Sequence, residues 1–524
     1  MADRSLPDLF AGMGDVFVLD ETSPAGEHRY GQDDIAAMAD RAQAGLASLG
    51  VHEGDRVAVW LPNGVEYLAL LWAAARLGIV IVSINTRFRS TEVADIVGRS
   101  GSRFLVLDPG FLGIDFESIL RSIQPDDLPR LEGLITLGSG TRDWPWPATS
   151  FDALCSVGVD SSDRSNIDLP YIVFTTSGTT RAPKLVLHNQ SSATAHALDL
   201  ASWFGSSALV AVPLCGVFGY TVMLGAIGAS ANQILQPVFD GAAAAHAIER
   251  HGIETFHGSD EMIARIAEVA TDAGLDLSSL GPVGYARFNN ALEDIPERAA
   301  AVGVTAVGLY GMSEVLALFA HRPAGPVDRV AVPGGHLVSG NADARVTDPS
   351  TGQPVSDGTD GELQLRGPSL FAGYLADGGN EIDAVLTDEH LDDGWFRTGD
   401  LARLDAPRSF EYIARMGDVL RLGGFLVSPA EIEGRLIDHP AIEAAQVVSV
   451  DLVGGPKAVA FVTTTDDAAD FDEQGVRQFC RDGLAGYKVP ARIVALSEFP
   501  TTASANGTKI QKVKLRDHAA SLFV

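Results

Sequence analysis

Strand-like and helix-like segments alternate along the first half of the chain, and this alternation restricts the fold more than any other feature. The series runs from RVAVWLP at 56–62 through a helical stretch at Val65–Leu77 to IVIVSIN at 79–85. A helical stretch at 90–101 and the run FLVLD at 104–108 continue it. Because such alternation produces parallel sheets covered by helices, the sequence predicts an α/β fold.

The same alternation returns after residue 200. Its members are, in order, ALVAVPL at 208–214, a helix at 220–228, NQILQPV at 232–238, a helix at Gly241–His251 and TFHG at 255–258. The two series together predict a large N-terminal domain that contains two βα-layered subdomains.

The pattern changes twice more toward the C-terminus. After about Pro333, short strands and turns such as ADARVTD and GELQLRG predict a small β-barrel-like subdomain. Further along, helices and strands mix, with a helix expected at Pro429–Ile437. We place a domain boundary at 415–418, which gives an N-terminal domain of residues 1–416 and a small α+β C-terminal domain of residues 417–524.

The charge balance is strongly acidic and limits the ligands that the surface can bind. Lys and Arg number 38 against 68 Asp and Glu, a formal net charge of −30. Such a chain has no basic stripe for nucleic acid, so we expect no nucleic-acid partner and local sites for any anionic ligand. Three widely spaced cysteines predict neither a disulfide framework nor a cysteine-based zinc site, which suits the cytoplasm. No run reaches the ~18 apolar residues of a membrane span.

A polar loop of sequence TTSGTTRAPK occupies 175–184, between apolar runs at 171–174 and 185–187. Backbone N–H groups and hydroxyls of such a loop can converge on one anion, and its final lysine adds a positive charge. Two interpretations are therefore open at this point. The loop binds phosphate, or it is an ordinary solvated turn, since Ser, Thr and Gly clusters usually mark turns.

Further motifs follow the loop in a fixed order. They are YGMSE at 310–314, GELQLRG at 361–367, WFRTGD at 395–400, RMGDVLRLGGFLVSPAEIE at 415–433 and NGTKIQKVKLR at 506–516. Together with GDRVAVWLPN near the start, this set resembles the adenylate-forming superfamily, which contains acyl-CoA synthetases, peptide-synthetase adenylation domains and firefly luciferase. The resemblance covers nearly the whole chain.

The resemblance implies a two-step reaction that uses ATP, Mg²⁺ and coenzyme A. In the adenylation half-reaction, a carboxylate attacks the α-phosphate of ATP to give an acyl-AMP. In the thioesterification half-reaction, the thiol of coenzyme A takes the acyl group. The expected partners are thus a small carboxylic acid or its acyl-AMP, and coenzyme A.

The resemblance also implies roles for residues of the YGMSE motif. Tyr310 would stack on adenine, which suits an aromatic face, and Gly311 would lie beside the nucleotide. Ser313 would contact the α-phosphate, and Glu314 would give Mg²⁺ a hard oxygen ligand. The alternative for Glu314 is an acidic residue favoured by a helix N-terminus.

Other nucleotide contacts are implied by the loop and by the later motifs. Asp400 would accept the ribose hydroxyls, with Arg415 beside it. Alternatively, Asp400 is a turn-forming residue and Arg415 a surface ion-pair partner. The loop residues that would bind phosphate are Thr175, Ser177, Gly178, Thr179, Thr180 and Lys184.

In this family the small C-terminal domain rotates between the two half-reactions, so the resemblance implies a mobile cap. The hinge position, two residues after Arg415, is Gly417, whose open backbone conformations ease rotation. Gly424 would lie along the tunnel that admits the pantetheine arm of coenzyme A. The catalytic lysine of adenylation matches Lys509 best, with Lys512 as the alternative.

The chain departs from the family pattern on the triphosphate and acyl sides. The usual loop reads SGTTGxPKG, and here Arg181 and Leu185 replace its third and last glycines. A large side chain there either occupies phosphate space or points outward. Gly216 stands where histidine is common, which predicts room for a bulky or hydrophobic carboxylic acid. The predicted pocket residues are Gly216, Phe218, Phe288 and Asn289.

These features leave several functions open. The leading hypothesis is an acyl-CoA ligase that works through an acyl-AMP. Because the departures spare the AMP and pantetheine motifs, the alternative is a variant that only converts preformed acyl-AMP and coenzyme A, with a partner enzyme for adenylation. A non-catalytic nucleotide-binding protein is a further alternative. A peptide-synthetase adenylation enzyme would usually need a pocket aspartate, and the sequence offers no confident match to one.

Overall fold

The structure is a computed structural model that describes residues 4–19, 26–138, 142–176, 183–287, 294–323, 332–416, 420–422, 425–427, 429–450, 452, 456–465, 471–484, 486–504 and 507–523. The chain divides into two compact units. The first unit comprises Met1–Asp343 and Leu365–Phe396, and the second comprises Ala344–Gln364 and Arg397–Val524. This division assigns 397–416 to the same unit as the C-terminal part, and a functional boundary near residue 417 stays a prediction.

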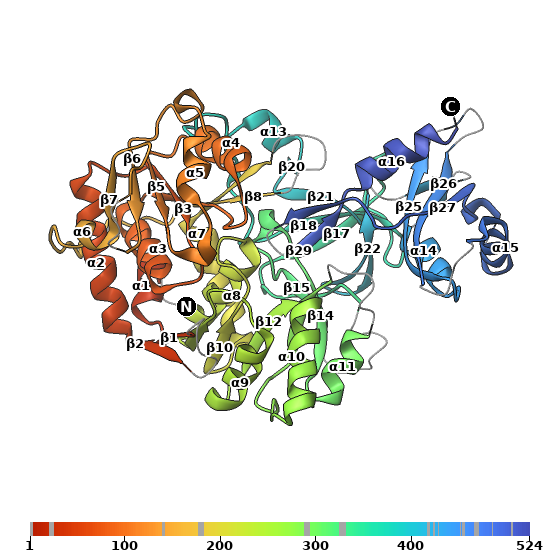
Figure 1. The fold of residues 1–524 in the computed structure, drawn as a ribbon, viewed down its shortest axis with the longest axis horizontal. Coiled ribbons are helices and arrows are strands. Elements are labelled where there is room, and N and C mark those ends of the chain that lie inside the picture. The colour runs from red at the N-terminus through yellow and green to blue at the C-terminus, as the bar shows by residue number, and fades with distance from the viewer. Residues whose placement is uncertain are drawn as a thin grey trace. The chain divides into compact units, whose positions relative to one another are not determined.

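The first βα series forms an eight-stranded sheet in the first unit (Figure 1). Its strands, in spatial order, are β19 (Gly373–Tyr374), β9 (Leu185–Asn189), β8 (Pro170–Thr175), β4 (Val80–Ser83), β3 (Arg56–Trp60), β5 (Phe104–Leu107), β6 (Gly133–Thr136) and β7 (Ala148–Ser150). The helices of this part are α2 (Gln32–Ser48), α3 (Val65–Leu77), α4 (Ser90–Ser100), α5 (Phe116–Arg121) and α6 (Phe151–Leu154). Strands β3, β4, β5 and β8 are joined by parallel pairings, whereas β9 runs antiparallel to β8.

Helix α3 shows why this layer forms. Gly64 precedes the helix, and Gly78 ends it with a φ of 70°, the left-handed conformation that glycine adopts most easily. Eleven of its thirteen residues are buried. A helix that is apolar on all sides needs cover on all sides, and this explains its place within the main hydrophobic core.

The second series forms another run of strands in the first unit. Their order is β16 (Gly334–Leu337), β15 (Ala320–His321), β14 (Ala306–Tyr310), β13 (Val283–Ala286), β12 (Thr255–Ser259), β10 (Ser207–Val210), β11 (Asn232–Leu235), β1 (Val16–Leu19) and β2 (Glu27–Tyr30). The other described α-helices of the first unit are α1 (Leu6–Ala11), α7 (Gln190–Leu200), α8 (Val217–Gly228), α9 (Gly241–His251), α10 (Asp260–Ala273), α11 (Ile295–Ala301) and α13 (Ala384–Asp388). Strands β10 to β14 are parallel, as the alternation predicts.

The second unit is richer in antiparallel strands. It contains most residues of β17 (Asp343–Thr347), β18 (Gly361–Arg366) and β21 (Trp395–Ala406), followed in the same spatial order by β22 (Ser409–Arg415). It also contains the hairpin of β23 (Leu420–Leu422) with β24 (Phe425–Val427). A three-stranded sheet of β25 (Ile442–Val450), β26 (Lys457–Thr464) and β27 (Arg492–Ala495) packs with α14 (Pro429–Ile437), α15 (Glu473–Gly483) and α16 (Lys512–Ser521). The predicted helix at Pro429–Ile437 is confirmed.

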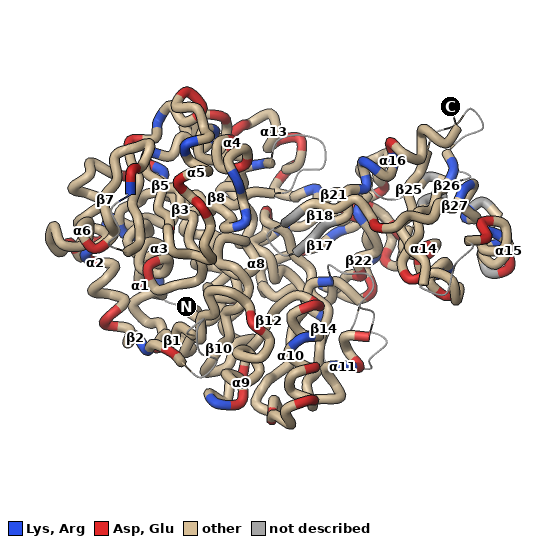
Figure 2. Tube along the Cα trace, in the orientation of Figure 1, with Lys and Arg blue, Asp and Glu red and all other residues tan. Residues whose placement is uncertain are grey.

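These elements confirm the predicted α/β fold class. Acidic and basic residues are interspersed along both units (Figure 2). Among the described residues, no helix is long and apolar enough to cross a bilayer.

Candidate functional site

Strand periodicity decides which side chains lie on the same face of β9 as the loop lysine. Lys184 directly precedes β9, and alternation places Val186 and His188 on its face of the strand. Leu185 and Leu187 lie on the opposite face, buried in a hydrophobic cluster of the first unit. The leucine that replaces the last family glycine is therefore a core residue directed away from the lysine.

The Lys184 ammonium contacts two side chains from a distant part of the sequence. Its Nζ lies 2.8 Å from His390 Nε2, and it donates to the Tyr374 hydroxyl at 3.5 Å. It also lies 4.6 Å from the centroid of the Tyr374 ring, within cation–π range. The Tyr374 hydroxyl in turn donates a 2.9 Å hydrogen bond to Glu314 Oε1. The loop lysine and the glutamate of YGMSE thus belong to one chain of contacts, which we call the lysine–glutamate chain.

Sheet pairing explains the position of Tyr374. Strand β19 runs antiparallel to β9 with Tyr374 opposite Val186, so the tyrosine side chain shares a face with Val186 and Lys184. Tyr374 is fully buried, and its ring lies 4.8 Å from that of Phe371. Packing on this side fixes the hydroxyl that links Lys184 to Glu314.

The 3₁₀ helix η4 (Ser313–Val315), which carries Ser313 and Glu314, is held through its backbone. His188 Nε2 donates to the Ser313 carbonyl at 2.7 Å, and the Phe371 N–H donates to the Glu314 carbonyl at 2.8 Å. Burial lowers the pKa of His188 to about 4, so the ring is neutral at pH 7. Strand β9 and the segment before β19 therefore both fix the Ser313–Glu314 backbone.

The turn after Glu314 is left-handed at three consecutive residues that carry a Cβ. The φ angles are 58° at Leu316, 49° at Ala317 and 33° at Leu318. Such strain persists only where the surroundings impose it, and it is typical of functional sites. Thr221 donates to the Leu316 carbonyl at 2.6 Å. A Cβ on Gly311 would lie 2.6 Å from the Ala317 backbone, so this close approach requires glycine at 311.

Thr175 and Tyr310 occupy corresponding positions in their sheets. Thr175 ends β8 and Tyr310 ends β14, and each strand has a parallel neighbour. Ligands of open α/β sheets bind at the carboxyl ends of such strands. Both predicted nucleotide-binding motifs therefore lie where this architecture accommodates a ligand.

In the second unit, Asp400 and Arg415 are directly opposite each other on β21 and β22. Arg415 Nη1 donates to Asp400 Oδ1 at 2.8 Å. The Asp400 side chain is only 3% exposed, whereas that of Arg415 is 54% exposed. Gly399 has a φ of 69°, and the Asp400 N–H donates to Thr398 Oγ1 at 3.0 Å, so a kinked, bonded backbone presents the carboxylate.

Two predicted pocket residues belong to α8. Gly216 is its N-cap, and Phe218 is buried in the main core. Helix α8 is buried from Phe218 to Ile227, while Gly216 lies at its partly exposed start. A role for either residue in acid binding stays a prediction.

Several other predicted site residues fall outside the described part of the chain. They are Ser177, Gly178, Thr179, Thr180, Phe288, Asn289, Gly417 and Gly424, and the substituted position Arg181 lies there too. The backbone of Lys509 lies in β29 (Gly507–Ile510), opposite Thr502 of β28 (Thr501–Ser504). Lys512 begins α16, and its Nζ lies 4.0 Å from Glu433 Oε1. The choice between the two lysines stays open.

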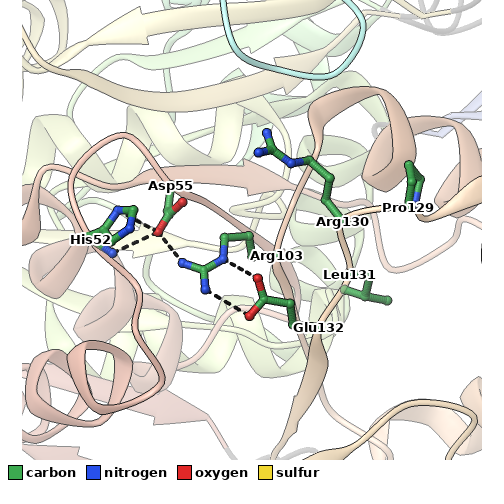
Figure 3. Close-up of a pocket in the computed structure, with 7 residues that line it drawn as sticks. All are labelled: His52, Asp55, Arg103, Pro129, Arg130, Leu131 and Glu132. Carbon is green, nitrogen blue, oxygen red and sulfur yellow. Dashed lines mark hydrogen bonds and ion pairs between the residues drawn. The ribbon is translucent and has the colours of Figure 1, made fainter.

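A separate polar pocket is lined by His52, Asp55, Arg103, Pro129, Arg130, Leu131 and Glu132 (Figure 3). Arg103 bridges Asp55 and Glu132, so the charges largely neutralise one another. Asp55, Arg103 and Glu132 immediately precede β3, β5 and β6, which places them at the amino ends of parallel strands. Because ligands of such sheets bind at the carboxyl ends, this pocket is best explained as a strand-end ion-pair network.

Comparison with known proteins defines the class. The sequence model of the AMP-binding enzyme family matches residues 16–375, and that of the AMP-binding enzyme C-terminal domain matches residues 431–506. The chain belongs to the AMP-binding enzyme family, in its acyl-CoA synthetase and ligase branch. The resemblance predicted from the motifs is confirmed.

Individual relatives agree with this assignment. A feruloyl-CoA synthase of Amycolatopsis is 30% identical over 91% of this chain and 91% of its own length. A Mycobacterium tuberculosis CoA ligase, named for a propanoyl chain on a methylated dioxo-octahydroindene ring system, is 29% identical over 94% of both chains. The crystal structure of the anthranilate CoA ligase AuaEII with anthranoyl-AMP has the same fold, with a TM-score of 0.79 at 22% identity over 99% of this chain and 98% of that one.

The sequence did not reveal three members of this site, namely His188, Tyr374 and His390. For His188 a signal existed, since a histidine four residues after Lys184 must share the lysine's side of an extended strand. Tyr374 and His390 reach the lysine only through tertiary pairing, 190 and 206 residues along the chain. No local pattern identifies them.

Proposed function

We propose that this protein is a complete acyl-CoA ligase that activates a bulky or hydrophobic carboxylic acid as its acyl-AMP and transfers the acyl group to coenzyme A. The lysine–glutamate chain is the observation that carries the proposal. It fixes a cation beside the carboxyl end of β8 and a carboxylate just after the carboxyl end of β14, where a nucleoside triphosphate and its metal would bind.

Each proposed role follows from the chemistry of the group. The ammonium of Lys184 would neutralise phosphate charge during adenylation, as would Lys509 from the C-terminal part. Ser313 would donate to the α-phosphate. Asp400, with its buried carboxylate, would accept hydrogen bonds from the ribose hydroxyls, and Arg415 would hold that carboxylate in place.

Glu314 suits Mg²⁺ that arrives with the nucleotide. Its Oε1 accepts from Tyr374, and its carboxylate carries a second oxygen for a cation. In the described residues no cluster of three or more His, Cys, Asp or Glu side chains could hold a metal. Mg²⁺ usually takes one or two carboxylates together with substrate phosphates, so a single glutamate fits this pattern.

The kind of carboxylic acid that the protein activates is proposed from two observations, the residue at the start of α8 and the acids named for two relatives. Gly216 places no side chain at the N-terminus of that helix, which favours a bulky acyl group. The named acids of the two relatives described above are an aromatic acid and a propanoate on fused rings. Phe218, Phe288 and Asn289 are the other residues proposed to shape this space.

The second candidate function is thioesterification alone, with adenylation carried out by a partner enzyme. Arg181 in the phosphate loop favours it. The position of Leu185 favours the complete ligase instead, because that substitution is absorbed by the core. We also propose Gly417 as the hinge, Gly424 as a pantetheine contact and the cytoplasm as the location.

Two parallel reactions test the proposal with the same panel of linear, aromatic and fused-ring acids. In the first, the protein receives acid, ATP, Mg²⁺ and coenzyme A. In the second, it receives synthetic acyl-AMP and coenzyme A. Thioester in both reactions supports a complete ligase, and thioester only in the second supports the partner-dependent variant. Failure of both reactions with every acid would refute the proposed activity.

A further inference from the structure

His390 presents an imidazole nitrogen directly to the loop lysine. It follows α13, a short helix held against β19 by hydrogen bonds from Tyr374 N–H to Thr387 Oγ1 and from Asp383 N–H to the Tyr374 carbonyl. The His390 N–H also donates to the Thr387 carbonyl at 3.0 Å. The imidazole is therefore supported by the same strand that carries Tyr374, and its ring packs edge-on against Tyr374 at 5.5 Å.

The two ring nitrogens of His390 have different partners, and these define its protonation state. Nδ1 lies 3.1 Å from the Leu386 carbonyl, which can only accept, so Nδ1 carries the proton. Nε2 lies 2.8 Å from Lys184 Nζ. An ammonium can only donate, so Nε2 is the acceptor and the imidazole is neutral when it binds a charged lysine.

The type of cation at position 184 matters for this contact, because the chain uses lysine there although arginine is far more common in this part of the sequence. Lys184 is the first lysine of the chain, and the next is Lys457, although arginines occur throughout the intervening sequence. An ammonium is a compact donor that can point one N–H at Nε2 and others elsewhere, whereas a planar guanidinium presents a fixed fork. The geometry at His390 suits lysine.

We propose that His390 is a positioning residue that holds the Lys184 ammonium for ATP, and that protonation of His390 releases the lysine and thereby inhibits adenylation but not thioesterification. The proposal rests on the proposed ligase function for its kinetic consequence. Protonation at Nε2 removes the acceptor and places two positive charges 2.8 Å apart.

The charges around His390 agree with a neutral ring. Burial, and then the positive charge of Lys184, lower its pKa, while the Leu386 carbonyl and the carboxylates of Glu314 and Glu389 act in the opposite direction. The net pKa lies below the ordinary value for histidine. The neutral form therefore dominates at pH 7, and the lysine is released as the pH falls through this lowered pKa.

Kinetics of the two half-reactions test the proposal. His390→Leu removes the acceptor, and we expect the KM for ATP to rise about tenfold, the value of one charge-assisted hydrogen bond. His390→Gln offers an amide oxygen without a titrating group, so it should recover much of this loss and abolish the acid limb of the pH profile of adenylation. The matched control is His28→Gln, because His28 is exposed on β2. Conversion of acyl-AMP should keep the wild-type pH profile in all variants.

An acid limb that persists in His390→Gln, or an equal loss in both half-reactions of His390→Leu, would overturn the proposal. A second measurement does not depend on activity. The NMR titration of His390, assigned by its absence in His390→Gln, should show a higher pKa in Lys184→Met than in the wild type, because the neighbouring charge is gone. An unchanged pKa would contradict the contact even if the protein forms no thioester. Failure of the ligase proposal itself would instead appear as missing thioester with an intact titration shift.

Discussion

The two units present their predicted nucleotide-binding charges in opposite ways. In the first unit, Lys184 and Glu314 are not paired directly, because the Tyr374 hydroxyl lies between them. In the second unit, Asp400 is bonded directly to Arg415. The first arrangement keeps opposite charges apart, so each can act on its own partner, whereas the second neutralises a carboxylate in advance.

Burial makes the same distinction. Tyr374 and Glu314 are buried, and their positions are fixed by neighbouring strands before any ligand arrives. Arg415 is half exposed, so its side chain can move without disturbing the core. The comparison indicates a preorganised site in the first unit and a more adaptable ion pair in the second.

The largest expected effect follows from Lys184→Met. Loss of the ammonium should slow adenylation by about 10²–10³-fold, because a preorganised charge on the phosphates is lost. Acyl-AMP carries no β- or γ-phosphate, so thioesterification should change little. Lys457→Met, at an exposed position of β26, is the control. The two half-reactions are measured by pyrophosphate release and by thioester formation. Equal inhibition of both would contradict the proposal that the Lys184 ammonium acts only in adenylation.

Asp400→Asn should have the next largest effect, and it should act on both half-reactions. Both use a ribose that would bind the carboxylate, and loss of one or two charge-assisted hydrogen bonds corresponds to about 10–10²-fold in kcat/KM. Asp360→Asn is the matched control, since Asp360 pairs with Arg403 at a more exposed position of the same unit. Loss confined to adenylation would argue against a ribose contact.

The sequence was informative where structure depends on local pattern. Helix α3 was predicted with its observed bounds because an apolar run ends at a glycine that can adopt a positive φ. The α/β class followed from the alternation of such runs with strands. Motif residues such as Glu314 and Asp400 could be proposed because their neighbours in sequence belong to the same motifs.

The contacts of these residues could not be predicted in the same way. His390 reaches Lys184 because β19 pairs with β9 and α13 packs on β19, which is a property of the folded sheet. The left-handed turn at Leu316–Leu318 was also invisible, because its residues carry no conformational signal for positive φ. The core role of Leu185 emerged only once its strand face was known.

Tyr374→Phe tests the hydroxyl that lies between Lys184 and Glu314 in the first unit. The ring and its cation–π contact remain, but Glu314 loses its hydrogen bond and Lys184 one acceptor. We expect adenylation to fall about five- to tenfold, the usual range for one buried hydrogen bond, with a higher Mg²⁺ requirement because Glu314 is less well oriented. Titration of Mg²⁺ at saturating ATP measures this. An unchanged Mg²⁺ dependence would show that the hydroxyl does not orient the carboxylate.

Arg415→Ala should have the smallest effect. Its ion pair with Asp400 is half exposed, and such pairs contribute up to about 1 kcal/mol, which corresponds to at most about fivefold in KM for ATP. Because solvent screens the exposed guanidinium, the difference between wild type and variant should shrink as salt is raised from about 0.05 to about 0.5 M. The screening length falls below about 10 Å within this range. Lys184→Met should lose less of its effect over that range, since Lys184 is partly buried beside the fully buried Tyr374. A salt-insensitive loss of 10²-fold in Arg415→Ala would instead place the arginine on the nucleotide itself.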